Sequence, residues 1–194
     1  MPDPGGTRRA AERFRAAVEA ALPGTVPFLP GADDATLDAL ERDLGRPWPP
    51  ELRALLATVG GQEDGISGPL NLMRFLRPEE IVAMHAMLVS AVGELTEPAA
   101  QPAPYRWEVW SDAWIPFVAF QGDSYCVDTD PGETGTAGQA FQRPNVPDLE
   151  EPEAPSVRAF LDGLAERLEQ GRFERQEAAE GLPPTAWVTL LDED

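Results

Sequence analysis

The chain has 194 residues, of which 34 are acidic and 15 are basic, and its formal net charge at pH 7 is −19. All 15 of these basic residues are arginine, which excludes a P-loop lysine, a Schiff-base lysine and a lysine general base. The charge also argues against nucleic acid as a ligand, because phosphate contacts require a positive surface. It favours either solubility or steered association with a basic partner, and charge alone does not choose between the two.

The single cysteine, Cys126, rules out an internal disulfide framework and a multi-cysteine metal site. It lies in a predicted strand, where we expect it to be a small core residue. No apolar run reaches the length of a membrane span, and the first residues lack the apolar segment of a signal peptide. We therefore expect a cytoplasmic protein made of one domain with extensions.

Residues 1–29 predict an N-terminal helix and a linker. Residues 1–6 are rich in proline and glycine and are expected to fray. Thr7 is the expected cap of the helix, and Pro23-Gly24 is its expected end. The apolar stripe of this helix contains Phe14, Val18 and Leu22.

The next region predicts a compact hairpin of two helices. Asp33 or Asp34 can cap the first helix, and Gly45 ends it because glycine readily adopts the left-handed conformation of a C-terminal cap. Pro49-Pro50 begins the second helix, since proline suits a first turn. That helix is expected to run up to Gly60-Gly61.

A short strand at residues 70–73 is predicted next, followed by a helix that begins near Pro78. One face of this helix carries Ile81, Met84, His85 and Leu88. Residues 93–104 form a proline-rich loop. The tryptophans that follow are interpreted as a partly buried cluster, because no cationic groove accompanies them to make a base-stacking platform; they are Trp107, Trp110 and Trp114.

The stretch from Trp114 to Phe141 predicts an antiparallel meander. Three short apolar runs alternate with Gly, Asp and Pro turn signals. Residues 122–124 are short enough for a tight hairpin, whereas residues 132–138 make a longer connection. The expected fold class is therefore α+β, with an antiparallel-rich sheet meander backed by helices.

After the meander, an acidic loop leads to a last helix capped by Ser156. The apolar face of this helix contains Val157, Phe160, Leu161, Leu164 and Leu168. Residues 173–194 form an acidic C-terminal extension. Within it, residues 186–191 predict either an extra edge strand or a segment that docks a partner.

The sequence predicts no catalytic group, cofactor or metal site. His85 lies in a helix, where a hydrogen-bonded structural role is expected, and one His with one Cys cannot supply the usual zinc ligands. Residues 128–130 resemble the opening of a calcium loop, but Glu133 stands where the sharp-turn glycine belongs, so a β-turn closed by aspartate is expected. A small hydrolase based on carboxylates stays open as an alternative, because paired carboxylates occur throughout so acidic a chain.

Three blocks of sequence occur in a recognisable order. Residues 40–61 contain a helix, a Gly-x-x-Pro corner and a helix that ends in glycine. Residues 114–139 lead from Trp-Ile-Pro through two strands to an Asp, a Pro-Gly turn and a Gly-Gln strand, and residues 156–168 form a Ser-initiated helix. With these blocks, residues 30–172 resemble the SUKH superfamily, which includes fungal cell-wall-assembly regulators and bacterial immunity proteins. Trp48-Pro49 departs from the Leu-Pro that is common there.

The resemblance implies a non-enzymatic protein-binding role and, in bacterial members, neutralisation of a cognate toxin domain, often a nuclease with a basic groove. The net charge of −19 agrees with a decoy for such a groove. A regulatory or scaffolding domain that binds cellular proteins is the alternative. The candidate partner-binding residues are acidic groups on the meander turns and the loop after them: Asp123, Asp128, Asp130, Glu133, Asp148, Glu150, Glu151 and Glu153.

Overall fold

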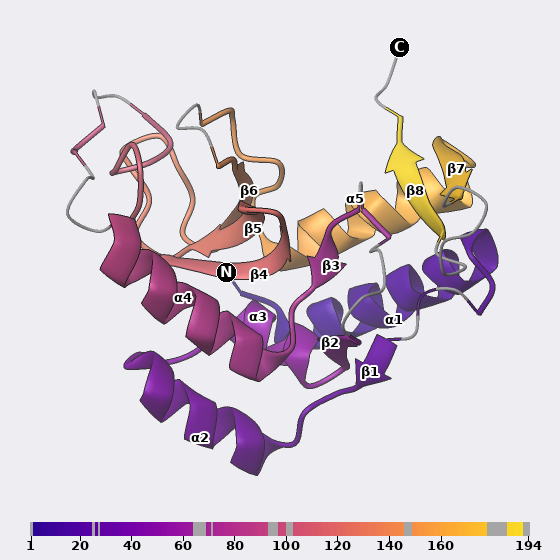
Figure 1. The fold of residues 1–194 in the computed structure, drawn as a ribbon, viewed down its shortest axis with the longest axis horizontal. Coiled ribbons are helices and arrows are strands. Elements are labelled where there is room, and N and C mark those ends of the chain that lie inside the picture. Colours follow the sequence, from indigo (N-terminus) through magenta and orange to yellow (C-terminus); the bar gives the residue numbers. More distant parts are fainter. Residues whose placement is uncertain are drawn as a thin grey trace.

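The computed structural model of the chain describes residues 2–24, 26, 28–63, 69–70, 72–92, 97–99, 103–145, 149–177 and 186–191. Its helices are α1 (Pro4–Ala21), α2 (Asp34–Leu44), α3 (Pro50–Leu56), α4 (Pro78–Val92) and α5 (Val157–Glu169). Its strands are β1 (Phe28–Pro30), β2 (Val59–Gln62), β3 (Arg74–Phe75), β4 (Trp114–Phe120), β5 (Asp123–Asp128), β6 (Gln139–Arg143), β7 (Phe173–Glu177) and β8 (Ala186–Leu190). The predicted α+β class is confirmed (Figure 1).

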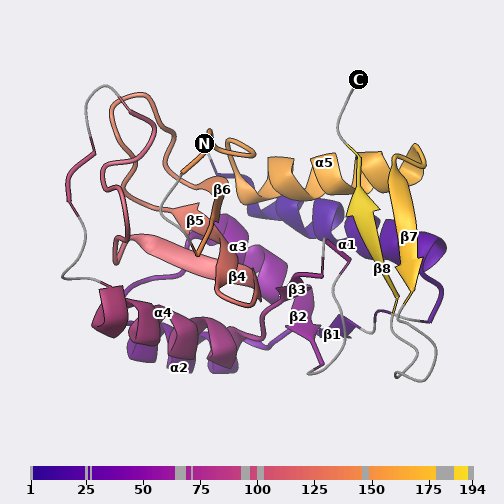
Figure 2. The same ribbon diagram turned by 45° about the horizontal axis from the view of Figure 1, so that its top comes forward.

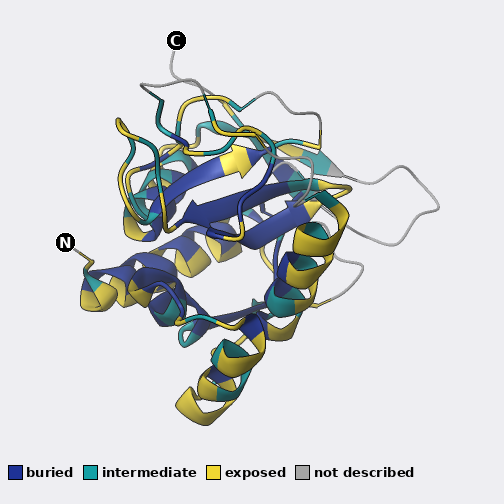
Figure 3. Cartoon of the chain, turned by 90° about the vertical axis from the view of Figure 1, so that its left-hand side faces the viewer, coloured by how far each residue is buried: buried dark blue, intermediate teal, exposed yellow. Residues whose placement is uncertain are grey.

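The main sheet has the strand order β3-β4-β5-β6, and every neighbouring pair is antiparallel. The predicted meander is therefore confirmed, with the tight hairpin between β4 and β5 and the longer connection between β5 and β6. The other strands form two separate two-stranded sheets, β1-β2 and β7-β8. Most of the main sheet is buried, and exposed residues lie on the outer sides of the helices and loops (Figure 3).

Strand alternation gives the main sheet two buried faces. Ile115, Val127 and Ala140 belong to the larger core, which lies against α1, α3 and α5. Leu55 and Phe117 are buried in it, and so is Leu161, which the sequence placed on the apolar face of the last helix. Phe160 of α5 packs edge-on against Phe117, with the ring centroids 5.5 Å apart. Helices α1 and α5 run side by side behind this face (Figure 2).

The opposite face carries a second, aromatic core. Trp114, Cys126 and Phe141 alternate with residues of the larger core and pack with Tyr105 and Trp110. Partly buried side chains complete this core: Leu88 and Val92 of α4, Trp107 and Leu149. The predicted tryptophan cluster and the predicted core position of Cys126 are both confirmed.

The N-terminus differs from its prediction. Helix α1 begins at Pro4, and its cap is Asp3, whose carboxylate accepts a hydrogen bond from the Gly6 amide at 2.9 Å. Thr7 is instead fully buried inside the helix, where its hydroxyl donates to the Asp3 carbonyl at 2.9 Å. Residues 4–6 are therefore helical, because a proline in the first turn and an aspartate cap outweigh the flexibility of the two glycines.

The region after α3 is also corrected. Helix α3 ends at Leu56, and Val59, Gly60 and Gly61 form strand β2 rather than the end of a helix. A Cβ atom on Gly60 would collide with the Pro30 carbonyl of β1, and Gly61 has a φ of 90°. The glycine pair therefore serves close strand pairing and an unusual backbone angle.

Two smaller predictions have different outcomes. The strand expected at residues 70–73 lies at Arg74–Phe75, while Leu70 and Met73 pair only as an isolated antiparallel bridge. The segment near the C-terminus is a strand, but β8 pairs with β7 and not with the main sheet. Val188 anchors this hairpin to the larger core with no exposed surface.

Candidate protein-binding surface

Three loops meet at the end of the main sheet where β5 finishes. The connection between β5 and β6 is tied to the segment Ala103–Tyr105 because the amides of Gly132 and Thr134 donate to the carbonyls of Pro104 and Ala103 at 3.0 and 3.2 Å. The Tyr105 hydroxyl donates to the Glu150 carbonyl at 2.7 Å, which attaches the loop after β6. These bonds gather acidic residues from two distant parts of the sequence.

Glu133, Glu150 and Glu151 lie at this junction with exposed side chains. Among the residues that the structure describes, none forms an ion pair with these three carboxylates. Burial raises the pKa of Tyr105, and the negative charges of Asp128, Glu151 and Glu150 add to that effect. We name Glu133, Glu150 and Glu151 the acidic junction.

Two further candidates are exposed but already paired. Asp130 lies 3.0 Å from the guanidinium of Arg106, and Glu153 lies 3.0 Å from that of Arg167 on α5. Exposed pairs of this kind contribute about 0–1 kcal/mol to stability. Each also cancels one negative charge, so Asp130 and Glu153 add less to the acidic field than the acidic junction does.

The structure corrects the expectation for Asp128, which is fully buried and cannot present its carboxylate to a partner. One oxygen accepts from the Asp130 amide at 2.9 Å, as expected for a turn closed by aspartate, and the other accepts from the Gln139 side chain at 3.2 Å. Burial raises the pKa of Asp128 to about 6, although both hydrogen bonds oppose the rise. Asp123 lies at the opposite end of β5 and accepts from the Asn145 amide, and Asp148 lies outside the described residues.

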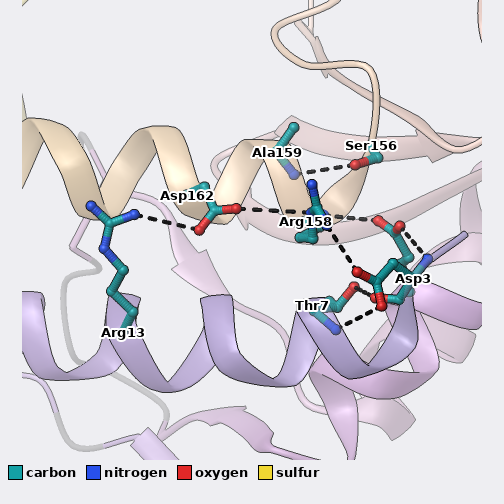
Figure 4. Close-up of polar contacts among 9 residues, drawn as sticks. Asp3, Thr7, Arg13, Ser156, Arg158, Ala159 and Asp162 are labelled. Atoms are coloured by element: carbon teal, nitrogen blue, oxygen red, sulfur yellow. Dashed lines mark hydrogen bonds and ion pairs between the residues drawn. The ribbon is translucent and has the colours of Figure 1, made fainter.

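A second polar site, missed from the sequence, joins three helices at their N-termini. Glu51 in α3 is only 9% exposed, and its two oxygens accept from the amides of Asp3 and Arg158 at 3.0 and 2.9 Å. Arg158 also pairs with Asp3 at 2.9 Å, and Asp162 joins Arg158 to Arg13 of α1 (Figure 4). Glu51 lies in an expected helix, and its long-range partners leave no signal in the sequence.

This site borders a cavity of about 320 Å³ between the helix N-termini and the end of β5. The amides that would attract an anion there already have partners: Glu51 accepts from Arg158, and Ser156 accepts from Ala159 at 3.1 Å. The hydrogen bonds of Glu51 therefore hold the helices together, and the site is structural.

The single histidine and the single cysteine of the chain, His85 and Cys126, are both held in the interior. Burial raises the pKa of the Cys126 thiol to about 12, so the reactive thiolate does not form at neutral pH. His85 is 7% exposed, its Nε2 lies 2.8 Å from the Asp112 carbonyl, and burial lowers its pKa. Within the described ranges, no cluster of His, Cys, Asp or Glu has the arrangement of a metal site.

The model of the SMI1/KNR4 family (SUKH-1) matches residues 31–163, about two thirds of the chain. The chain belongs to this family. A comparison with curated proteins gives no match. The SMI1/KNR4 match begins just before α2 and ends within α5, so α1 and the β7-β8 hairpin lie outside it. Both nevertheless contribute to the larger core, through Phe14 and Val188. In the part of the chain that the structure describes, no helix is long and apolar enough to cross a membrane.

Proposed function

We propose that this member of the SMI1/KNR4 family is an immunity protein that binds and neutralises a toxin domain with a basic, nuclease-type groove. The observation that carries the proposal is the acidic junction, where three exposed carboxylates that have no ion-pair partner among the described residues are presented on loops anchored to the sheet. Loops on a rigid scaffold commonly carry binding groups. Neutralisation requires only occupancy of the groove, which agrees with the buried positions of His85 and Cys126.

Electrostatic steering explains how such a protein would find its target. Complementary charge raises the association rate, and this effect weakens with salt because the Debye length is about 8 Å at physiological ionic strength. Dissociation depends on close contacts and responds less to salt. We therefore expect the association rate with the toxin domain to fall steeply as salt is increased.

The decisive experiment pairs the chain with the toxin domain encoded next to its gene. Co-expression should restore growth to cells that produce the active toxin domain. Stopped-flow association with an inactivated toxin domain should slow at low salt when Glu133, Glu150 and Glu151 are replaced by glutamine. A matched control removes three other exposed carboxylates, Glu12, Glu63 and Glu166, and should slow association less.

Two outcomes would count against the proposal. If the chain neither binds the toxin domain nor restores growth, the immunity function is wrong and a regulatory domain of the same family becomes the better explanation. If binding occurs at a salt-independent rate, or both triple variants slow equally, the acidic junction is not the steering surface.

A further inference from the structure

Beyond its first turn, which carries the exposed Glu79, helix α4 has an exposed side without charge. Its last twelve residues, 81–92, contain no Asp, Glu or Arg. The inner side is held by the buried Ile81 and His85 and by contacts of Leu88 and Val92 with the aromatic core. The exposed side, which we name the α4 face, consists of Ala83, Ala86, Met87, Val89, Ser90 and Ala91.

The α4 face is unusual for a surface helix, which normally places charged residues outward. The chain is 25% charged, and α1, α2 and α5 all carry Arg and acidic residues on their exposed sides. Met87 and Val89 are 53% and 39% exposed, and they are two of the four large apolar residues exposed in the described part of the chain. Helical spacing places Ala83, Ala86 and Met87 on adjoining turns, so the apolar surface is contiguous. Contiguous exposed apolar surface marks interaction sites.

Carboxylates flank the α4 face on two sides. Helix α2 lies beside α4 (Figure 2) and carries four acidic residues and one arginine. Three of these carboxylates, Asp34, Asp38 and Glu41, already pair with Arg53 of α3, so Asp43 is the main contribution of α2 to this flank. Near the other end of α4, the exposed Glu97 and Glu108 are held together by a backbone hydrogen bond of 3.0 Å. They adjoin the Pro98–Trp107 bridge, and Trp107 packs on the same aromatic core as the C-terminal part of α4.

We propose that the α4 face docks an apolar patch bordered by arginine or lysine on the toxin domain, which extends the proposed function. The acidic flanks select this occupant, because they attract a basic border around an apolar centre. A second copy of this chain would bring a net charge of −19 and the same carboxylates against these flanks, which opposes self-association. The segment 103–108 continues from this border to the acidic junction, so both surfaces can contact one partner.

The two surfaces then have different kinetic roles. The acidic junction sets the association rate through long-range attraction, whereas the α4 face sets the dissociation rate through desolvated apolar contacts. Replacing Met87 by glutamine and Val89 by serine removes apolar surface without changing the charge. We expect this double variant to bind the toxin domain at least tenfold more weakly, with faster dissociation and a nearly unchanged association rate.

The test is binding kinetics between the full chain and the inactivated toxin domain encoded next to its gene. The matched control is Leu191→Gln, which replaces an apolar side chain that is 41% exposed in another part of the molecule. An independent readout is Ala86→Cys, since the buried Cys126 leaves the new thiol as the accessible one. We expect the toxin domain to slow maleimide labelling of this thiol.

The outcomes separate the two proposals. If the wild-type chain binds but the double variant keeps its affinity, or labelling of Ala86→Cys is unchanged by the toxin domain, the α4 face is not the docking surface and the immunity function stands. An equal loss of affinity in Leu191→Gln would also overturn the assignment. If the wild-type chain does not bind the toxin domain at all, both proposals are wrong.

Discussion

The buried carboxyl group of Asp128 should make the protein less stable as the pH rises through 6. Its pKa is about 6 in the folded protein against an ordinary value of 3.8, because burial disfavours the charged form. A gap of about 2 units corresponds to about 3 kcal/mol of folding free energy. The folded state binds the proton more tightly, so this stability is fully present below the unfolded pKa and is lost as the pH rises through the folded one.

The perturbation that isolates this effect is Asp128→Asn. Other carboxylates also titrate, and relief of repulsion among them changes stability in the same pH range. The asparagine cannot ionise, and its carbonyl can still accept from the Asp130 amide. Its amide group takes the place of the oxygen that accepts from Gln139, so two N–H donors face each other. The resulting loss of stability is independent of pH. The pH dependence of the difference in free energy of unfolding between the variant and the wild type therefore reports the titration of Asp128 alone.

Urea unfolding of both proteins across the pH range is the measurement. We expect the free energy of unfolding of Asp128→Asn to rise relative to wild type by about 2 kcal/mol between about pH 4.5 and 7.5, from the same linkage relation. A difference that does not change with pH, or that falls as the pH rises, would refute the reasoning. It would mean that the hydrogen bonds from Asp130 and Gln139 outweigh the burial of this carboxylate.

Three further changes test the core, the helix junction and the absence of a catalytic role. Leu161→Ala should lower the free energy of unfolding in urea by about 2–5 kcal/mol, because it leaves a cavity in the core, whereas Leu191→Ala should have little effect. Glu51→Ala should cost about 1–3 kcal/mol, because the amides of two helix N-termini lose their acceptor, and Glu51→Gln, which keeps one acceptor, should cost less. The double variant His85→Gln and Cys126→Ser should still restore growth beside the toxin domain if it folds, and a folded but inactive double variant would revive the hydrolase hypothesis.

The elements with local signals were predictable from the sequence. Gly45 ends α2 in the left-handed conformation, and Ser156 caps α5, because each of these roles depends on one residue and its immediate neighbours. The Gly60-Gly61 pair misled the prediction, since a glycine that ends a helix and a glycine that permits close strand pairing have the same sequence appearance. Only the distant carbonyl of Pro30 distinguishes the two.

The candidate site was predictable in composition but not in geometry. The sequence places Asp128 and Asp130 on the same turn, yet the turn directs one carboxylate into the protein and the other into solvent. Glu133 and Glu150 are 17 positions apart, and the contacts of the segment 103–105 bring their loops together. The α4 face did have a signal in the sequence, because residues 81–92 contain no charge. A search for the periodic positions of a buried core does not detect it, since half of the apolar residues in this run are exposed.

The placement of charge separates two explanations for the acidity of the chain. If acidity served solubility alone, charged residues would be most useful on exposed apolar surface, where association with other proteins begins. Beyond its first turn, the outer side of α4 is instead uncharged, while α2 beside it carries four acidic residues, three of them paired with Arg53. Solubility accounts for the carboxylates, but it does not explain why the apolar side chains of Met87 and Val89 are exposed to solvent. The proposed recognition of a basic partner would account for both features, because the carboxylates would attract the partner and the apolar face would retain it.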